Sequence, residues 1–263
     1  MCRLSGFTAR DLDPAMKRLF WHQLMLVSNA EGQFDGTGMT DGELLLKCEL
    51  PFSNFGADWV SQLRHDAIWV GHVRSASPNT AHTVLEAHPF VFDVGDTRLF
   101  AAHNGGIKGM PAASVGEPKV DSYQAFKLLI ALLQEQRDFT PELINTWVSK
   151  FGVGSEWAFM FHYQDKLTIV RGVRPMCYME FNDGIMFNTS YNVLLHMKEW
   201  VRLYWGKNYR IGKITEIADY QMTTLAIGSH AIELSALSKP VALPVFTGLY
   251  YKYDGKEHLI KRA

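Results

Sequence analysis

A run of short β-strands in the second half of the chain is the sequence feature that most constrains the fold. From residue 157 onward the apolar pattern changes to a period of two, which is typical of strands whose successive side chains point to opposite faces of a sheet. Turn residues at Gln164-Asp165 and at Asn182-Asp183-Gly184 separate the strands, so we expect short, closely connected strands here. The predicted strands are 157–163, 167–171, 176–181 and 185–188.

Helical periodicity flanks this region on both sides. After Asp121 or Ser122 as an N-cap, apolar side chains recur at three- and four-residue spacing, which predicts a helix with one buried side. A second helix is expected from Thr140-Pro141, because proline suits the first helical position, and a third over 191–204.

The first third of the chain mixes both types of element. The expected elements are a strand over 2–9, a helix from Asp13-Pro14 up to Gly32, and short strands over 44–46, 68–74 and 98–103. Residues after 206 return to strand-like segments. This order fits two stacked sheets with helices outside them, an α+β architecture, better than a doubly wound parallel sheet.

Composition is that of an ordinary soluble globular protein. The 263 residues suffice for one large domain, 47% of them are hydrophobic, and the net charge is −1. This charge balance argues against nucleic acid or a membrane surface as main partner. No segment has the length of a membrane span and no signal peptide is recognised, so we expect a cytoplasmic protein. Three widely separated cysteines also argue against a disulfide framework.

A cysteine at position 2 can act as a nucleophile that carries its own base. Initiator methionine is normally removed when the next side chain is small, which would leave Cys2 with a free α-amino group. The pKa of such an amine is about 7.7–8.0, so it can accept the thiol proton near neutral pH. The position of Cys2 by itself also fits a structural residue in an edge strand. Evidence from other segments is needed to distinguish this interpretation from the catalytic one.

Three further segments could complete such a site. Arg74 follows an apolar strand and precedes small residues, which suits a guanidinium that binds a carboxylate in a pocket. Asn104 and Gly105 lie at a strand end, where a side-chain amide and a backbone N–H could form an oxyanion hole. Asp121 stands at a helix start. Taken singly, such residues are more often a surface salt bridge, a plain turn and an N-cap.

Taken together, these segments resemble the class II glutamine amidotransferase family of N-terminal-nucleophile (Ntn) hydrolases, and in particular its stand-alone glutaminase-type members. The motifs are MCRLSGF at 1–7, DGTG at 35–38, GHVRSAS at 71–77, AHPF at 87–90, AHNG at 102–105 and VDS at 120–122. They follow the family's order, and the resemblance covers about residues 2–195, with 156–192 similar to the second sheet of that domain.

The resemblance implies a four-layer α/β/β/α sandwich and a role for each motif residue. Cys2 would be the nucleophile and its α-amine the base, while the Asn104 side chain and the Gly105 N–H would stabilise the oxyanion. Arg74 would bind the α-carboxylate of glutamine, and Asp121 its α-ammonium group. The supporting pocket residues would be Ser77 and His88. Residues 196–263 are not placed by the resemblance, and we treat them as an extension of the same domain.

Other reactive side chains fit structural roles better. Cys48 and Cys177 lie in apolar strands, and we expect them to be inert core thiols. No phosphate-binding glycine-rich loop is recognised. Four histidines in one third of the chain match no compact metal-binding pattern, so we expect neither a metal nor a cofactor. These histidines are His72, His82, His88 and His103.

The predicted reaction is hydrolysis of the side-chain amide of glutamine through a γ-glutamyl thioester on Cys2. Ammonia would pass to an acceptor on a separate protein, because the chain is too short for the additional acceptor domain of synthase members. The aromatic cluster Tyr250-Tyr251-Tyr253 is a candidate docking surface, or else part of a terminal strand pair. Two alternatives stay open: a hydrolase of another γ-glutamyl amide or peptide, and a catalytically silent Ntn scaffold subunit.

Overall fold

The computed structural model of this protein describes most of the chain, including all of residues 83–181. Within the expected helix between Pro14 and Gly32, the described residues are helical, whereas Ser77 and His82 lie outside the described part of the chain. The described residues are 2–9, 19–20, 22–26, 35–51, 61–64, 68–76, 83–181, 184–204, 209–227, 232–238, 249–251 and 259–261.

The first of two large sheets has seven strands, and every neighbouring pair in it is antiparallel. Strand β1 (Arg3–Ala9) confirms the predicted first strand, and it is a central strand rather than an edge strand. In spatial order the sheet comprises β11 (Ile211–Glu216), β9 (Cys177–Phe181), β10 (Gly184–Asn188), β1, β4 (Ile68–Val73), β2 (Thr37–Thr40) and β3 (Leu45–Cys48).

The second sheet has six strands and is also antiparallel throughout. Its central pair, β6 and β7, is in register from Leu99 opposite Tyr163 to Gly106 opposite Glu156. In spatial order the sheet comprises β13 (Ser235–Ala236), β12 (Gln221–Ala226), β8 (Lys166–Arg171), β7 (Glu156–Tyr163), β6 (Thr97–Gly106) and β5 (Phe90–Val94). The two antiparallel sheets with few helices confirm the predicted α+β class.

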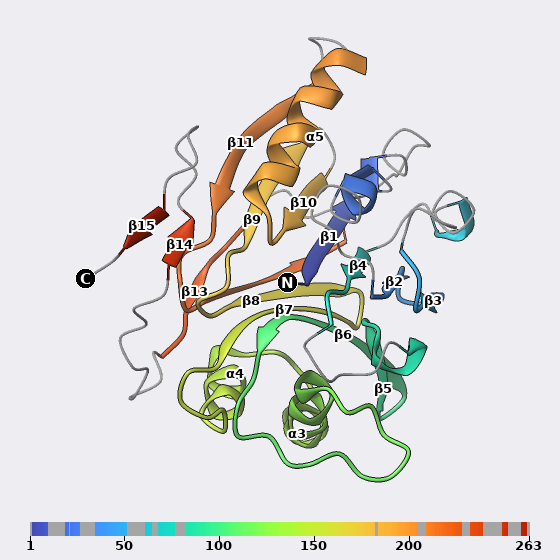
Figure 1. Cartoon of the computed structure of the whole chain (residues 1–263), viewed down its shortest axis with the longest axis vertical. Coiled ribbons are helices and arrows are strands. Elements are labelled where there is room, and N and C mark those ends of the chain that lie inside the picture. The colour runs from blue at the N-terminus through green and yellow to red at the C-terminus, as the bar shows by residue number, and fades with distance from the viewer. Residues whose placement is uncertain are drawn as a thin grey trace.

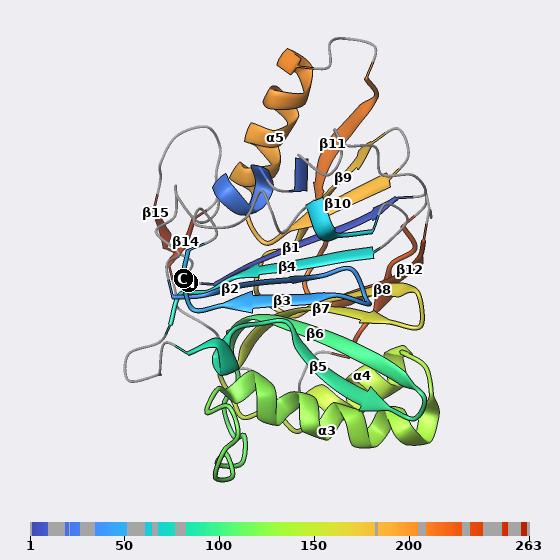
Figure 2. The same ribbon diagram turned by 90° about the vertical axis from the view of Figure 1, so that its right-hand side faces the viewer.

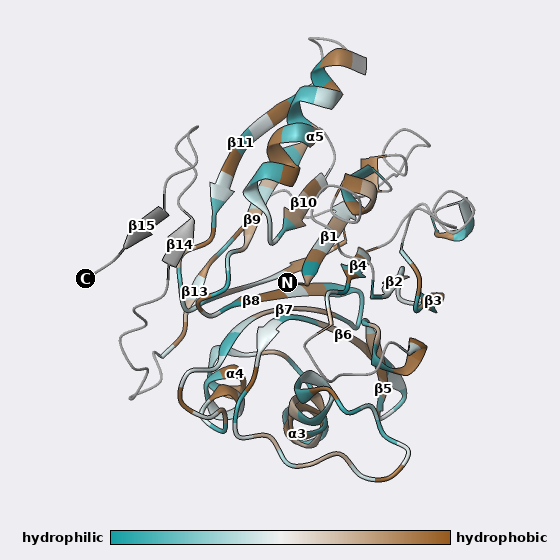
Figure 3. Ribbon diagram, viewed as in Figure 1, coloured by the Kyte–Doolittle hydropathy of each residue, from teal (hydrophilic) through white to brown (hydrophobic). Residues whose placement is uncertain are grey.

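Helices cover the outer faces of both sheets (Figures 1 and 2). Helices α3 (Asp121–Gln136) and α4 (Pro141–Val148) pack on the second sheet, and α5 (Tyr191–Tyr204) packs on the first. The α5 residues Val193, Met197 and Val201 recur every four positions and are buried, so α5 shows hydrophobic and hydrophilic segments side by side in Figure 3. No helix in the described residues is long and apolar enough to cross a membrane.

A separate apolar core fills the space between the sheets. Leu4 and Val70 from the first sheet meet Ala102 and Met160 from the second in this core. Because strand side chains alternate in direction, Phe7 of β1 points the other way and packs among the residues that contact α5. The direction of Leu4 therefore shows which face of β1 looks toward the second sheet.

The predicted strands between 157 and 188 all form, but they do not share a sheet as the resemblance of 156–192 suggested. Strands β7 and β8 belong to the second sheet, whereas β9 and β10 belong to the first. The connection through Pro175 carries the chain from one sheet to the other. The tight turn at Gln164 and Asp165, both with positive φ (51° and 55°), keeps β7 and β8 together in one hairpin.

Strand β6 is longer than predicted, and β5 was not foreseen. The expected turn at 104–106 is the last part of β6, because Asn104, Gly105 and Gly106 continue the ladder with β7. Strand β5 pairs with β6 from Phe90 to Val94, next to a cis peptide bond between His88 and Pro89. Asn104 and Gly105, the residues predicted to form an oxyanion hole, are therefore held inside a strand pair rather than on a free turn.

The segment beyond residue 196 joins both sheets. Strand β11 is the edge of the first sheet next to β9, and β12 extends the second sheet next to β8. Strands β14 (Leu249–Tyr251) and β15 (Leu259–Lys261) form a separate antiparallel pair. The side chains of Tyr250, Tyr251 and Tyr253 lie outside the described part of the chain.

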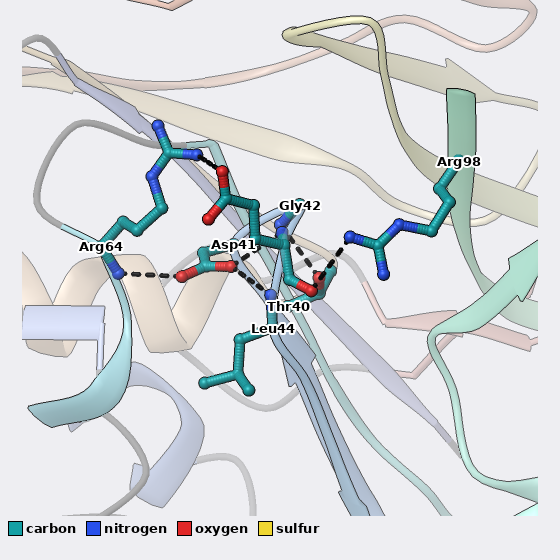
Figure 4. A network of polar contacts seen from close by, with 7 residues as sticks. Thr40, Asp41, Gly42, Leu44, Arg64 and Arg98 are labelled. Carbon is teal, nitrogen blue, oxygen red and sulfur yellow. Dashed lines mark hydrogen bonds and ion pairs between the residues drawn. The ribbon is translucent and has the colours of Figure 1, made fainter. Parts of the chain in front are cut away.

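A polar network fixes the turn between β2 and β3 and ties it to the second sheet (Figure 4). The carboxylate of Asp41, 2% exposed, accepts hydrogen bonds from the backbone N–H groups of Glu43 (3.0 Å) and Arg64 (2.8 Å). Arg98 of β6 donates from Nη2 to the carbonyl oxygen of Glu43 at 3.2 Å. This network lies at the end of β2 opposite to the end that adjoins Arg74, so it braces the two sheets away from Cys2.

Candidate active site

Cys2 directly precedes β1 and is half-buried. Because Leu4 points toward the second sheet, strand alternation directs Cys2 to the same side. Its Sγ accepts a hydrogen bond from the Ser75 backbone N–H at 3.4 Å, and the thiol can donate to the Ser75 carbonyl oxygen at the same distance. Burial raises the pKa of the Cys2 thiol, while the hydrogen bond to the Ser75 backbone and the positive charge of Arg74 lower it.

Arg74 follows β4, and the next residue, Ser75, contacts the Cys2 thiol through its backbone. Its backbone N–H donates to the Gly36 carbonyl oxygen at 2.8 Å, and its own carbonyl oxygen accepts from the Asp35 N–H at 3.2 Å. The side chain is buried, and its Nη2 lies 2.9 Å from Oε2 of Glu86. Its Nη1 donates to the carbonyl oxygen of Asp35 at 3.4 Å. The arginine is thus anchored at the predicted position, but with an acidic partner that the sequence did not reveal.

Glu86 is the residue of this site that sequence reasoning missed. It ends the short 3-10 helix η2 (Val84–Glu86), and only 3% of its surface is exposed. The available signal was a single acidic residue between Leu85 and Ala87, which by itself favours a surface position, because glutamate is rarely buried without a partner. Only the three-dimensional approach to Arg74 distinguishes these alternatives.

Asn104 presents a buried amide on the second sheet. Ala102 belongs to the core between the sheets, so strand alternation turns Asn104 toward the first sheet as well. The residue is 1% exposed, and among the described residues neither its Oδ1 nor its Nδ2 has a hydrogen-bond partner. The amide of Asn104 is therefore not engaged by a neighbouring group in the described part of the chain, and it can donate to or accept from a ligand atom.

Gly105 follows with a backbone conformation that requires glycine. Its φ is +138°, and a Cβ at this position would overlap the backbone carbonyl of Glu156 on the neighbouring strand. The close approach of β6 and β7 at this point is therefore compatible with glycine alone. This geometry explains why glycine follows Asn104, whatever role its backbone N–H plays.

Asp121 is the first residue of α3 rather than its cap. The N-cap position is Val120, which has no side-chain capping bond, and the carboxylate of Asp121 itself accepts from the N–H of Ser122 at 2.7 Å. It also accepts a short hydrogen bond from the N–H of Ile107, just after β6. The negative charge of Asp121 acts on the thiol of Cys2, where it raises the pKa. Asp121 therefore lies within electrostatic reach of Cys2.

His88 belongs to a group of buried histidines beside the site. Its Nε2 lies 2.9 Å from Oγ of Ser122, and its ring centroid lies 4.3 Å from that of His72 and 6.4 Å from that of His103. Burial lowers the pKa of all three, to about 3 for His72, to about 4 for His103 and well below the usual value for His88. These rings are therefore neutral at physiological pH, and His88 contacts the first turn of α3 next to Asp121.

The structure brings most of the predicted site residues together. Cys2, Arg74 and Asp121 interact electrostatically, His88 contacts the neighbour of Asp121, and Ser77 lies outside the described residues. Cys177 is buried on β9, as expected for a core thiol, whereas Cys48 is half-buried on the edge strand β3 and is not a core residue. Within the described ranges, no three His, Cys, Asp or Glu side chains are arranged to hold a metal ion.

Chemically, the Cys2 thiol lies near a buried cation, Arg74, and a carboxylate, Asp121, while the Asn104 amide faces the first sheet from β6. Burial raises the pKa of the Cys2 thiol, so attack at neutral pH needs a base at hand. An α-amino group on the same residue would provide one. The arrangement suits nucleophilic attack on a carbonyl carbon of an amino-acid-like substrate.

Comparison with known proteins finds matches in structure but not in sequence. No protein-family model matches the chain, and no curated protein matches it in sequence. Among solved structures, glutamine phosphoribosylpyrophosphate amidotransferase from B. subtilis matches with a TM-score of 0.64 at 17% identity, over 90% of this chain and 49% of that one. An allosteric regulatory enzyme of purine biosynthesis matches with a TM-score of 0.67 at 17% identity, over 92% of this chain and 50% of that one.

This chain therefore spans about half the length of those two enzymes. A protein of similar size, a glutamine aminotransferase class-II domain protein from Silicibacter pomeroyi, matches with a TM-score of 0.55 at 14% identity, over 90% of this chain and 100% of that one. The resemblance found in the motifs is confirmed at the level of the fold: the chain has the fold of class II glutamine amidotransferase proteins.

Proposed function

We propose that this protein hydrolyses the side-chain amide of glutamine through a thioester on Cys2. The observation that carries the proposal is the position of the Cys2 thiol, which contacts Ser75 and lies beside Arg74 and within reach of Asp121. The order helix, sheet, sheet, helix supports a four-layer Ntn sandwich, with residues 2–195 as the amidotransferase-like domain. Residues 196–263 would extend the same domain, since β11 and β12 lengthen its two sheets.

The reaction would proceed in two steps. The α-amine of Cys2 takes the thiol proton, Sγ attacks the amide carbon, and the Asn104 amide with the Gly105 N–H stabilises the oxyanion. The C–N bond then breaks, the amine proton passes to the leaving group, and ammonia departs from a γ-glutamyl thioester. Water next attacks the thioester carbon with the same amine as base, so that glutamate and the free thiol are released.

Substrate recognition would use the two charged groups of an α-amino acid. Arg74 would bind the α-carboxylate and Asp121 the α-ammonium group, which matches each charge with its opposite. His88 would support this pocket through Ser122 and the first turn of α3, and Ser77 would be a further pocket residue. Ammonia would then pass to an acceptor site on a separate protein.

A second candidate function uses the same residues on a different leaving group. A hydrolase of γ-glutamyl amides or peptides needs the same γ-glutamyl half of the substrate, and differs only in what leaves. A candidate of another class is a catalytically silent scaffold subunit. The position of the Cys2 thiol beside the Arg74 cation and within reach of the Asp121 carboxylate favours catalysis over the silent alternative, because a scaffold has no need of this combination.

The test is an assay of amide hydrolysis on protein whose free Cys2 amine has been verified by mass. We expect release of ammonia and glutamate from glutamine, and no activity in Cys2→Ala, a variant that keeps a small second residue and so leaves Met1 removal unchanged. A glutamine-mimicking diazo-ketone should label Cys2 alone.

Three outcomes would contradict the proposal. Faster release from γ-glutamyl peptides than from glutamine would favour the second candidate. An inert wild-type protein with a free amine would favour the scaffold. Labelling at Cys48 or Cys177 instead would show that Cys2 is not the nucleophile.

A further inference from the structure

The buried ion pair between Arg74 and Glu86 has no part in the reaction steps above. Nη2 of the arginine lies 2.9 Å from Oε2 of the glutamate, and each side chain is only 4% exposed. In the proposed function, Arg74 also binds the α-carboxylate of the substrate. Two carboxylates, one from the protein and one from the substrate, would therefore share a single guanidinium.

The backbone holds both members of this pair in place. The Glu86 N–H donates to the Thr83 carbonyl oxygen at 3.1 Å, which closes the single turn of η2. The next residue, Ala87, packs against Gly36, where an added Cβ would meet the Ala87 Cβ at 3.5 Å. Gly36 in turn accepts the hydrogen bond from the Arg74 backbone. Glu86 and Arg74 are thus anchored to the same loop, with little freedom to separate.

Stability alone does not account for such a pair. Removing two charges from water costs several kcal/mol per ion, and an apolar pair of similar volume is often as stable or more so. A buried pair does fix orientation, and a guanidinium binds a carboxylate through two parallel hydrogen bonds only when its plane has the correct orientation. The buried pair therefore contributes more to the orientation of the guanidinium for ligand binding than to the stability of the fold.

We propose that Glu86 is a positioning residue that orients the Arg74 guanidinium toward the α-carboxylate of the substrate. The inference rests on the proposed function, and it deepens the account of specificity at the same site. Glu86 does not touch the substrate and acts only through Arg74. Its removal should therefore weaken binding of a substrate that carries an α-carboxylate, and spare one that lacks it.

The experiment compares glutamine with its α-amide, in which the α-carboxylate is replaced by an uncharged group. In Glu86→Ala we expect the KM for glutamine to rise by roughly tenfold or more, with kcat within about twofold of wild type, because the carboxylate contact is the same in the ground and transition states. For the α-amide, kcat/KM should stay within about twofold of wild type. The double variant Arg74→Ala/Glu86→Ala should match Arg74→Ala alone, because Glu86 acts through Arg74.

Two further variants act as controls. Glu86→Gln keeps the volume and an oxygen acceptor but loses the charge, so its KM for glutamine should rise by about threefold or more, even if Glu86→Ala fails to fold. Glu43→Ala removes another ion-paired glutamate, whose Oε1 lies 2.5 Å from Nη1 of Arg64 at the end of β2 away from Arg74. This variant should leave the kinetics with both substrates unchanged.

Labelling of Cys2 by the diazo-ketone, which carries the same α-carboxylate, measures the contact without turnover. Glu86→Ala should need a correspondingly higher diazo-ketone concentration for half-maximal labelling, while iodoacetamide should react as in wild type. Equal losses with glutamine and its α-amide, or no loss in either Glu86 variant, would overturn the positioning role alone. A wild-type protein that neither turns over glutamine nor is labelled at Cys2 would overturn the proposed function itself.

Discussion

At the level of single residues, burial and neighbouring charge separate the three cysteines of this chain. Burial raises the pKa of the Cys177 thiol to about 12, and it also raises the pKa of Cys48. Cys2 is raised by burial too, but the hydrogen bond to the Ser75 backbone and the Arg74 guanidinium oppose that effect. The backbone N–H of Leu50 also lowers the pKa of Cys48, and Arg171 lowers that of Cys177, but only at Cys2 do a backbone hydrogen bond and a cation act together.

The Asn104 amide allows a test of the oxyanion hole. Replacing Asn104 by alanine should lower kcat by roughly 10²–10³ and change KM little, because the hydrogen bond strengthens only as negative charge develops on the carbonyl oxygen. Steady-state kinetics with glutamine measure both constants. Asn145→Ala is the matched control, since its Oδ1 accepts a hydrogen bond from the N–H of Ser238, remote from Cys2. An effect on KM alone would mean that Asn104 only shapes the pocket.

The motif residues could be predicted from the sequence because their chemistry is local. Cys2 and Arg74 were each expected next to a strand end, and the structure confirms those two positions, with Cys2 just before β1 and Arg74 just after β4. Glu86 could not be predicted, because its importance depends on a partner twelve residues away, across a loop. Pairing of that kind depends on tertiary structure, and a single sequence carries no sign of it.

At the level of elements, local signals account for the successes and long-range pairing for the errors. Helix α4 begins where Thr140 and Pro141 predicted, and Oγ1 of Thr140 accepts from the Leu143 N–H at 3.1 Å. Helix α5 has the predicted bounds, because its apolar side repeats over several turns. Asn104 and Gly105 were expected in a turn, since Asn-Gly is a common turn sequence. Their pairing with β7 outweighs that local preference.

The glycine at position 105 gives a prediction at this level. Gly105→Ala should destabilise the protein by about 2 kcal/mol, because its φ of +138° is strained for alanine and the added Cβ would meet the Glu156 backbone. Gly95→Ala is the matched control: its φ is +59° and no heavy atom lies within 4 Å of the added Cβ. The control should cost about 1 kcal/mol from backbone strain alone.

Urea unfolding of both variants, together with glutamine hydrolysis, separates strain from function. Gly105→Ala should lose activity even under conditions in which it is folded, because its N–H is placed by the β6–β7 pairing. Gly95→Ala, in the turn between β5 and β6, should keep full activity. Equal stability losses in the two variants would mean that the Glu156 backbone yields to the extra methyl group.

At the level of the whole molecule, three apolar cores formed by the described residues join the two sheets and their helices. The sequence indicated the stacked sheets through its strand periodicity, but not which strands share a sheet. The assignment of β9 and β10 to the first sheet depends on β1. On one side β1 pairs with β10, with Ser5 opposite Asn188, and on the other side it pairs with β4, with Arg3 opposite Val73. Pairing over such sequence distances is set by burial of both faces of β1, which one sequence cannot show.

Buried histidines make the stability of the whole molecule dependent on pH. Burial lowers the pKa of His72 to about 3 and those of His103 and His162 to about 4, and it also lowers that of His88. In the unfolded chain the pKa of histidine is about 6.5, so below that pH the unfolded state binds protons that the folded state does not. The stability contributed by these neutral rings is thus complete above pH of about 6.5 and is lost as the pH falls toward 4.

We therefore expect the free energy of unfolding to fall steeply between about pH 6.5 and pH 5, with each of these histidines adding up to about 1.4 kcal/mol per pH unit. Urea unfolding at half-unit pH steps measures the slope, and this window lies above the usual pKa of aspartate and glutamate, so histidine dominates it.

His162→Gln is the sharpest comparison, because His162 adjoins Gly42 at the turn between β2 and β3, at the end of β2 away from Arg74. In this variant the unfolding free energy should depend less steeply on pH, because unfolding takes up about one proton fewer in this window. Its rate of glutamine hydrolysis at neutral pH should be unchanged. A stability that stays constant from pH 7 to pH 5 would show that the rings accept protons inside the folded protein, and would contradict their assignment as neutral core residues.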